Sequence, residues 1–537
     1  QNDSADYFLG GRDATWLAIG ASIFASNIGS EHLIGLAGAG ASSGMAMAHW
    51  EIQGWMILIL GWVFVPFYTR SMVYTMPEFL ERRYNPQSRT ILSVISLVSY
   101  VLTKVAVTVY AGGLVFQQVF GIKELWGIDF FWIAAIGLVV LTALYTIFGG
   151  MKSVLYTSVL QTPILLLGSL IILVLGFKEL GGWDEMMRVC GAVTVNDYGD
   201  TMTNLIRSND DANFPWLGAL IGSAIIGFWY WCTDQFIVQR VLSGKNEMEA
   251  RRGTIFGAYL KLLPVFLFLI PGMIAFALHQ KYIGAGGEGF LPMLANGTAN
   301  ADAAFPTLVA KLLPAGVKGL VVCGILAALM SSLASLFNSS AMLFTIDFYK
   351  RFKPETPEKK LVGIGQIATI VIVVLGILWI PIMRSVGDVL YTYLQDVQSV
   401  LAPGIAAAFL LGICWKRTSA QGGMWGLISG MVIGLTRLGA KVYYSNAGEV
   451  ADSTFKYLFY DMNWLFFCGW MFLFCIIVVI VVSLATEAPT AEKIQGLVFG
   501  TATKEQKAAT RASWNHWDII HTVIILAITA AFYWYFW

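Results

Sequence analysis

Runs of about 20 apolar residues recur along the whole chain, with short polar segments between them. A run of this length crosses a hydrocarbon core of roughly 30 Å as an α-helix. A helix satisfies its backbone hydrogen bonds internally, which lipid requires of any spanning segment. The alternating stretches of about 10 residues that build a membrane β-barrel are absent from the sequence. The pattern therefore predicts an all-α polytopic membrane protein.

The apolar pattern also predicts where the chain crosses the membrane. Long polar or Gly/Ala-rich loops are expected at 178–213, 281–313 and 486–514, and a short interfacial helix at 77–85. The thirteen predicted spans are 14–41, 50–69, 88–120, 130–148, 153–177, 214–240, 255–280, 314–347, 361–383, 387–412, 420–440, 459–485 and 515–537.

Composition and charge agree with this pattern. Of the 537 residues, 57% are hydrophobic and 12% are charged, whereas a soluble domain carries roughly 25% charged residues. A net charge of +1 argues against a nucleic-acid-binding surface. If the segment before the first span is cytoplasmic, the connections on that side hold 21 of the 34 basic residues, as the positive-inside rule expects. We expect a multi-pass protein of the plasma (cell inner) membrane.

The first ten spans divide into two sets of five, and each set opens on an interrupted helix. The interruptions read FASNIGSEH at 24–32 and FWYWCTDQ at 228–235. Because five is odd, the second set must run with inverted topology. Inverted repeats with matching interruptions indicate a secondary transporter whose ligand lies near the middle of the membrane. A helical bundle with glycine kinks is the alternative interpretation.

These features divide the chain into parts. The division is a first inverted repeat at 14–177, an outer loop at 178–213, a second inverted repeat at 214–412, and three peripheral helices at 413–537 with a cytoplasmic loop at 486–514.

A few ionisable residues lie within the predicted spans, where facing lipid would cost about 3 kcal/mol at the membrane centre. They are therefore expected to face the interior of the bundle. These residues are Glu31, His32, Glu51, Lys104, Asp234 and Lys261. Glu31 and His32 could alternatively form a proton relay. No metal-ligand spacing, nucleophile–base pair or cofactor fingerprint accompanies them in the sequence, so an enzyme is not expected.

The interrupted segments combine polar and aromatic residues. A hexose presents hydroxyl groups around a weakly apolar face, so its site needs mixed polar side chains and an aromatic platform. For each aromatic residue, core packing is the alternative role. The predicted substrate-binding residues are Asn27, His32, Glu51, Tyr230, Trp231, Lys261 and Gln395. Ser331 and Ser332 could offer hydroxyls to a sodium ion, although serines in membrane helices usually bond their own backbone.

Seven long stretches resemble the sodium/glucose cotransporter branch of the sodium–solute symporter family. They cover most of the chain, without gaps, and include rare residues such as Trp and Cys. The stretches are IGASIFASNIGSEHLIGLAG (19–38), GWVFVPFY (61–68), TMPEFLERRY (75–84), WYWCTDQFIVQRVLSGKN (229–246), YLKLLP (259–264), LMSSLASLFNSSAMLFTIDFY (329–349) and FLLGICWKR (409–417).

The resemblance implies a LeuT-type core of five plus five inverted helices with extra peripheral helices, here at 420–537. Family members usually carry one more helix before the first core helix. We therefore expect a preceding helix to be missing before Gln1, with 1–13 as an N-terminal cytoplasmic segment.

The resemblance also implies roles for individual residues. Sugar hydroxyls would be bonded by Asn27, His32, Glu51, Lys261 and Gln395, and Trp231 would line the site. Tyr230 would stack on the pyranose ring and close the site from the cytoplasmic side. An outer hydrophobic gate would consist of Leu36, Trp50 and Tyr391. A sodium site would use the carbonyls of Ala25, Ile28 and Ala328 with the hydroxyls of Ser331 and Ser332.

Three positions depart from the family pattern. Ser158 stands where members with a second sodium site have Asp, and Ala334 where two-sodium members have Thr. Losing a carboxylate weakens a cation site strongly, so one sodium per sugar is expected. Gly227 replaces a polar residue found in some sugar carriers, which leaves the identity of the sugar open.

We therefore expect a sodium-coupled monosaccharide symporter that works by alternating access, with a glucose- or galactose-like hexose as substrate. The alternatives are a symporter of the same fold for inositol, sialic acid or an amino acid, and a non-transporting sugar sensor. The sequence leaves the oligomeric state open.

Overall fold

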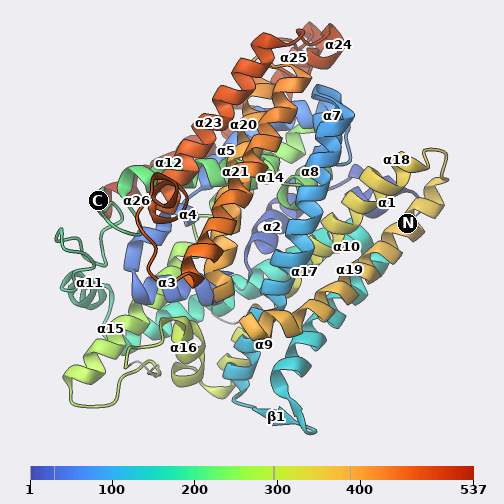
Figure 1. The fold of residues 1–537 in the computed structure, drawn as a ribbon. Coiled ribbons are helices and arrows are strands. Elements are labelled where there is room, and N and C mark those ends of the chain that lie inside the picture. The colour runs from blue at the N-terminus through green and yellow to red at the C-terminus, as the bar shows by residue number, and fades with distance from the viewer. Residues whose placement is uncertain (1, 30, 294–296, 387–388) are drawn as a thin grey trace.

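The computed structural model describes residues 2–29, 31–293, 297–386 and 389–537, and this part of the chain is mostly helical (Figure 1). Strands β1 (Glu124–Leu125) and β2 (Ile128–Asp129) form a short antiparallel hairpin. Among the described residues, eight helices are long and apolar enough to cross a membrane. The predicted all-α polytopic class is confirmed.

The α-helices are, in chain order, α1 (Ser4–Leu9), α2 (Trp16–Asn27), α3 (Ala37–Ser42), α4 (Ala48–Glu51), α5 (Gly54–Ile59), α6 (Val65–Ser71), α7 (Met76–Arg83), α8 (Pro86–Ser99), α9 (Ala106–Phe120), α10 (Phe130–Leu180), α11 (Trp183–Gly191), α12 (Trp216–Phe228), α13 (Gln235–Leu242), α14 (Glu247–Leu260), α15 (Ile270–Gly284), α16 (Ala304–Leu312), α17 (Ala315–Met342), α18 (Lys350–Phe352), α19 (Glu358–Val386), α20 (Val389–Cys414), α21 (Ala420–Asn446), α22 (Thr454–Lys456), α23 (Trp464–Ala485), α24 (Ala491–Ile494), α25 (Lys504–Ala512) and α26 (His516–Tyr535).

Segments of π-helix join many of these helices into longer spans. A π segment adds a residue to one turn, and such segments occur frequently at functional sites. They are η2 (Glu31–Leu36), η4 (Leu60–Phe64), η5 (Tyr100–Val105), η6 (Trp229–Thr233), η7 (Val265–Leu269), η9 (Leu343–Tyr349) and η10 (Tyr457–Asp461). Short 3₁₀ segments are η1 (Gly10–Arg12), η3 (Gly44–Met47) and η8 (Ala301–Ala303).

Helix α10 covers two predicted spans, 130–148 and 153–177. They meet at Gly150, whose φ of 57° and ψ of −150° break the helical path. A Cβ atom at Gly150 would lie 2.4 Å from the carbonyl oxygen of Tyr7. Only glycine combines this conformation with so close an approach, so the chain turns between the two spans without a connecting loop. The short helix predicted at 77–85 corresponds to α7, which begins at Met76, is capped by Thr75 and has Pro77 in its first turn.

The predicted connections meet at two opposite ends of the molecule, with α7, α24 and α25 at one end and α11, α16 and β1 at the other (Figure 1). We call the first the basic end; it is formed by 70–76, 243–252, 348–358 and 486–514. Here Arg70 donates to Thr510 Oγ1 (2.5 Å), and Arg251 donates to Ser513 Oγ (2.5 Å).

At the opposite end, Met45 N–H donates to the Met202 carbonyl (2.8 Å). The connections that the distribution of Lys and Arg assigns to the same side of the membrane therefore lie at the same end of the molecule. Which end faces the cytoplasm stays a prediction.

The centre of the fold lies where α2 packs against α10, α14 and α17. Glycines permit the closest of these contacts. A Cβ atom at Gly20 would lie 2.8 Å from the Gly253 carbonyl oxygen. Helix α2 is thereby held on three sides up to the point where it ends at Asn27.

Candidate functional site

Both predicted interruptions coincide with real breaks in helices. Helix α2 ends at Asn27, and Ile28 is extended with φ −76° and ψ 111° before η2 resumes the turn. In the second set, α12 leads into η6, and Asp234 is extended with φ −79° and ψ 129° before α13. Backbone groups next to such breaks lack helical partners and are free to bind other groups.

Four of the predicted substrate-binding residues form one polar network. Lys261 Nζ donates to Asn27 Oδ1 (2.9 Å) and to Glu51 Oε2 (2.7 Å). The same Glu51 oxygen lies 3.2 Å from His32 Nε2. His32, Glu51 and Lys261 are all buried. The network therefore gathers a carboxylate, an ammonium, an imidazole and an amide from separate helices at the break in α2.

Two aromatic side chains of η6 border this network. Trp231 places its ring 5.3 Å from Lys261 Nζ and donates from Nε1 to Gln53 Oε1 (3.2 Å). The Tyr230 ring stands perpendicular to it, at 88° with a centroid distance of 4.8 Å. Asn27 Nδ2 donates to the Tyr230 hydroxyl (3.2 Å). Both predicted aromatic residues thus contact the polar cluster.

These residues line a cavity of about 110 Å³. Its remaining walls include Leu36 and Trp50 of the predicted outer gate, together with Gly227, Gln53 and Gln398. The side chains of predicted Tyr391 and Gln395 lie outside the described residues.

Gln53 and Gln398 were not among the predicted site residues. Gln53 bridges two walls of the cavity, because its Nε2 donates to the Ser223 carbonyl (2.8 Å) while its Oε1 accepts from Trp231. A Cβ atom at Gly227 would lie 2.8 Å from Gln53 Nε2. Glycine at position 227, where some sugar carriers have a polar residue, therefore leaves room for the Gln53 amide.

The predicted sodium ligands lie where the end of α2 meets α17. A Cβ atom at Gly29, next to Ile28, would lie 3.1 Å from Ser332 Oγ. The hydroxyls of Ser26 and Ser335 are hydrogen-bonded across the same contact. Ser331 donates its hydroxyl to Gln161 Oε1.

The other two predicted ligands, Ala25 and Ala328, are buried in these helices. Among the described residues no three His, Cys, Asp or Glu side chains could together hold a metal ion. The ligands predicted for a cation at this contact, backbone carbonyls and serine hydroxyls, are all neutral oxygens.

A second buried ion pair lies behind Tyr230. Lys104 Nζ is 3.1 Å from Asp234 Oδ2 and 5.1 Å from the centre of the Tyr230 ring. Arg240 is fully buried nearby, and no described residue accepts a hydrogen bond from its guanidinium. Lys104 and Asp234 thus face the interior, as the cost of exposing charges to lipid predicted.

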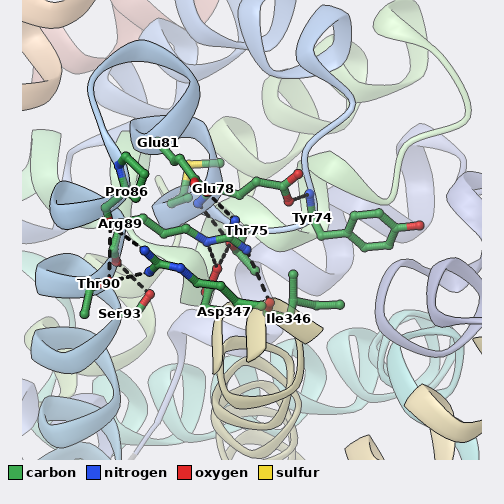
Figure 2. A network of polar contacts seen from close by, with 12 residues as sticks. Tyr74, Thr75, Glu78, Glu81, Pro86, Arg89, Thr90, Ser93, Ile346 and Asp347 are labelled. Atoms are coloured by element: carbon green, nitrogen blue, oxygen red, sulfur yellow. Dashed lines mark hydrogen bonds and ion pairs between the residues drawn. The ribbon is translucent and has the colours of Figure 1, made fainter. Parts of the chain in front are cut away.

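A third polar network ties helices together at the basic end (Figure 2). Asp347 Oδ1, in η9, accepts from Arg89 Nε (2.8 Å) and from Thr75 Oγ1 (2.9 Å). Arg89 is also paired with Glu81 of α7. The network joins the end of the α17 span to the connection between α6 and α8.

Comparison with known proteins agrees with the fold. The model of the Sodium:solute symporter family matches residues 7–430. The human Sodium/myo-inositol cotransporter 2 is 37% identical over 508 residues, which are 92% of this chain and 74% of that protein. The Sodium/glucose cotransporter 1 of Ovis aries is 38% identical over 499 residues, 90% of this chain and 74% of that protein.

Solved structures show the same fold. A Na⁺-coupled sialic acid symporter in a substrate-bound outward-open state superposes with a TM-score of 0.71 at 22% identity, covering 91% of this chain and 94% of that one. The predicted LeuT-type core with peripheral helices is therefore confirmed. The chain belongs to the sodium:solute symporter family, a family of membrane transporters, and sodium is its co-transported ion.

Proposed function

We propose that this chain imports a monosaccharide, a glucose- or galactose-like hexose, together with one sodium ion. The observation that carries the proposal is the cluster of Asn27, Glu51 and Lys261 beside Tyr230 and Trp231. Its amide, carboxylate and ammonium groups can donate to and accept from hydroxyls. The charges of Glu51 and Lys261 already balance each other within the protein, so a neutral polyol can add hydrogen bonds to the cluster without having to compensate a charge.

An inositol is the second candidate, since one similar protein is named a sodium/myo-inositol cotransporter and another a sodium/glucose cotransporter. Both are neutral polyols, and the cluster suits either. A carboxylate-bearing substrate such as an amino acid or a sialic acid fits less well. Glu51 would repel a substrate carboxylate, because like charges brought together in a buried site cost several kcal/mol.

Coupling to sodium follows from the short path between the two sites. Ile28 and Gly29, beside Ser332, directly follow Asn27 in the chain. A cation held there would order the backbone that orients Asn27 toward Lys261 and Tyr230. By linkage, sodium and sugar must raise each other's affinity by the same factor.

The proposed cycle is alternating access in the plasma membrane. Sodium would hold the break in α2 in a form that accepts sugar from outside, where Leu36 and Trp50 border the cavity. Inward release would require Tyr230 to leave its bond with Asn27. Ser158 supports a single sodium, because it offers a neutral hydroxyl, which donates to the Val154 carbonyl (2.6 Å), where members with a second sodium site have a carboxylate.

The test is uptake into proteoliposomes with an imposed sodium gradient, using labelled hexoses, inositols and amino acids. We expect concentrative uptake of a hexose that disappears without sodium. Glu51→Ala should abolish uptake, and Ser332→Ala should weaken its sodium dependence. Ser429→Ala, which removes a hydroxyl that donates to the Trp425 and Gly426 carbonyls of peripheral helix α21, far along the chain from the cavity residues, is the matched control. Uptake of an amino acid and of no polyol would refute the substrate while leaving the family assignment intact.

A further inference from the structure

The segment that carries Trp50 and Glu51 into the cavity is held from outside the ten-helix core. It begins at Gly44, whose φ is 76° and where a Cβ atom would lie 2.1 Å from the Met202 carbonyl oxygen. The next residue, Met45, donates its N–H to that same carbonyl (2.8 Å). The outer loop is therefore pressed directly against the start of this segment.

His49 makes the central contact. Its ring is buried, and both of its nitrogens have partners: Nε2 lies 2.9 Å from the Leu205 carbonyl oxygen, and Nδ1 lies 2.9 Å from the Tyr533 hydroxyl. A carbonyl can only accept, so Nε2 carries the proton and Tyr533 donates to Nδ1. Leu205 N–H in turn donates to the Phe536 carbonyl (2.8 Å). His49 thus joins the outer loop to peripheral helix α26.

An aromatic contact completes the arrangement. Trp50 stacks on Trp464 of peripheral helix α23, with centroids 5.6 Å apart and planes at 16°, and it meets the edge of Phe214 at 5.8 Å. Asp211 fixes Phe214 by accepting its N–H (2.7 Å). Burial opposes the charge of Asp211, but hydrogen bonds from Asn196 and from the Phe214 and Asn213 N–H groups outweigh burial and lower its pKa.

From these contacts we infer that segment 202–214, α23 and α26 form a brace that sets the position of the substrate-binding segment, and that His49 is its positioning residue. His49 does not line the cavity, whereas its neighbours Trp50 and Glu51 do. A shift of His49 would move the gate ring and the Glu51 carboxylate together. The brace therefore tunes substrate affinity through Leu205, Trp464 and Tyr533, which lie outside both repeats. This inference rests on the proposed polyol transport for its functional readout.

The test is a double-mutant cycle on sodium-driven hexose uptake. Tyr533→Phe removes one buried hydrogen bond and should raise the apparent KM about fivefold, with Vmax and sodium dependence little changed. His49→Phe should raise it further, and the double variant should be no worse than His49→Phe, because the pair acts as a unit. Tyr535→Phe removes a hydroxyl of the same helix that bonds only Trp183, and it should leave KM unchanged. Additive effects, or an equal effect of Tyr535→Phe, would overturn the inference.

Hydrogen exchange separates this inference from the proposed function. In Tyr533→Phe, amide exchange over 43–51 should accelerate about fivefold relative to Tyr535→Phe, whatever the substrate is. If the wild-type protein takes up no polyol, the proposed function fails and the exchange comparison alone decides on the brace. Equal amide exchange over 43–51 in Tyr533→Phe and Tyr535→Phe would overturn the inference of a brace.

Discussion

Removing one partner of the Glu51–Lys261 pair should destabilise the protein more than removing both. Their atoms are 2.7 Å apart, and both side chains are nearly fully buried. At an effective dielectric constant of about 20, the attraction at this distance is about 6 kcal/mol. Desolvation offsets much of that gain, but breaking such a pair still typically costs about 3–5 kcal/mol, because one charge stays buried without its partner.

The two single variants should differ. Lys261→Met leaves the Glu51 carboxylate with His32 as its remaining partner, so we expect a loss of about 3–5 kcal/mol in unfolding free energy. Glu51→Gln keeps a carbonyl that can accept from Lys261, so we expect about 1–3 kcal/mol. The double variant carries no unpaired charge and should be more stable than Lys261→Met.

Thermal unfolding in detergent would measure this ranking, with sodium-driven uptake measured in parallel. All three variants should lose sugar uptake, since the cluster loses its donor, its charged acceptor or both. A Lys261→Met protein as stable as the wild type would refute the reasoning. A double variant that is less stable than either single variant would also refute the reasoning. The loss of unfolding free energy would then not come from an unpaired buried charge.

Three further outcomes are expected. Sodium activation of uptake should follow a Hill coefficient near one, and reversal-potential measurements in proteoliposomes should give one sodium per sugar; a value of two would contradict the role given to Ser158. Ser332→Ala should raise the sodium concentration for half-activation about tenfold or more, while Ser429→Ala leaves it unchanged. Asp347→Ala should cost about 3 kcal/mol of unfolding free energy because Arg89 loses a buried carboxylate, whereas exposed Lys353→Ala should cost under about 0.5 kcal/mol; thermal unfolding compares the two.

The charged part of the cavity could be predicted from the sequence because apolar spans leave ionisable groups few acceptable positions. Glu51 and Lys261 lie in separate spans, and each would cost about 3 kcal/mol facing lipid. Facing inward, they find each other and Asn27 at the break in α2. The two interruptions were also visible, because small and polar residues replace the apolar pattern there.

The neutral part of the cavity could not be predicted in the same way. Gln53 has no charge, so its place in a span raises no comparable cost. Counted along a regular helix, it would point about 200° away from Glu51. The chain leaves helical geometry at Ile52, with φ −88° and ψ 45°, which brings both side chains to the cavity. Such a local break follows from tertiary packing, and the one local signal near it, Gly54, marks the start of α5 and does not place the break at Ile52. The glycine turn within α10 is similar, since Gly150 acts through its contact with distant Tyr7.

The π segments have a consequence for any residue-by-residue scan of this transporter. Each extra residue in a turn rotates the helix that follows by about 100°. Along 216–242, a stripe of cysteine accessibility that repeats every three or four residues should therefore change phase across η6 and the extended residue Asp234. A helical wheel drawn through α12 would assign the wrong face to the residues of α13. The phase of such a scan, followed through substrate and sodium addition, reports whether η6 and the break at Asp234 keep their geometry while the transporter works.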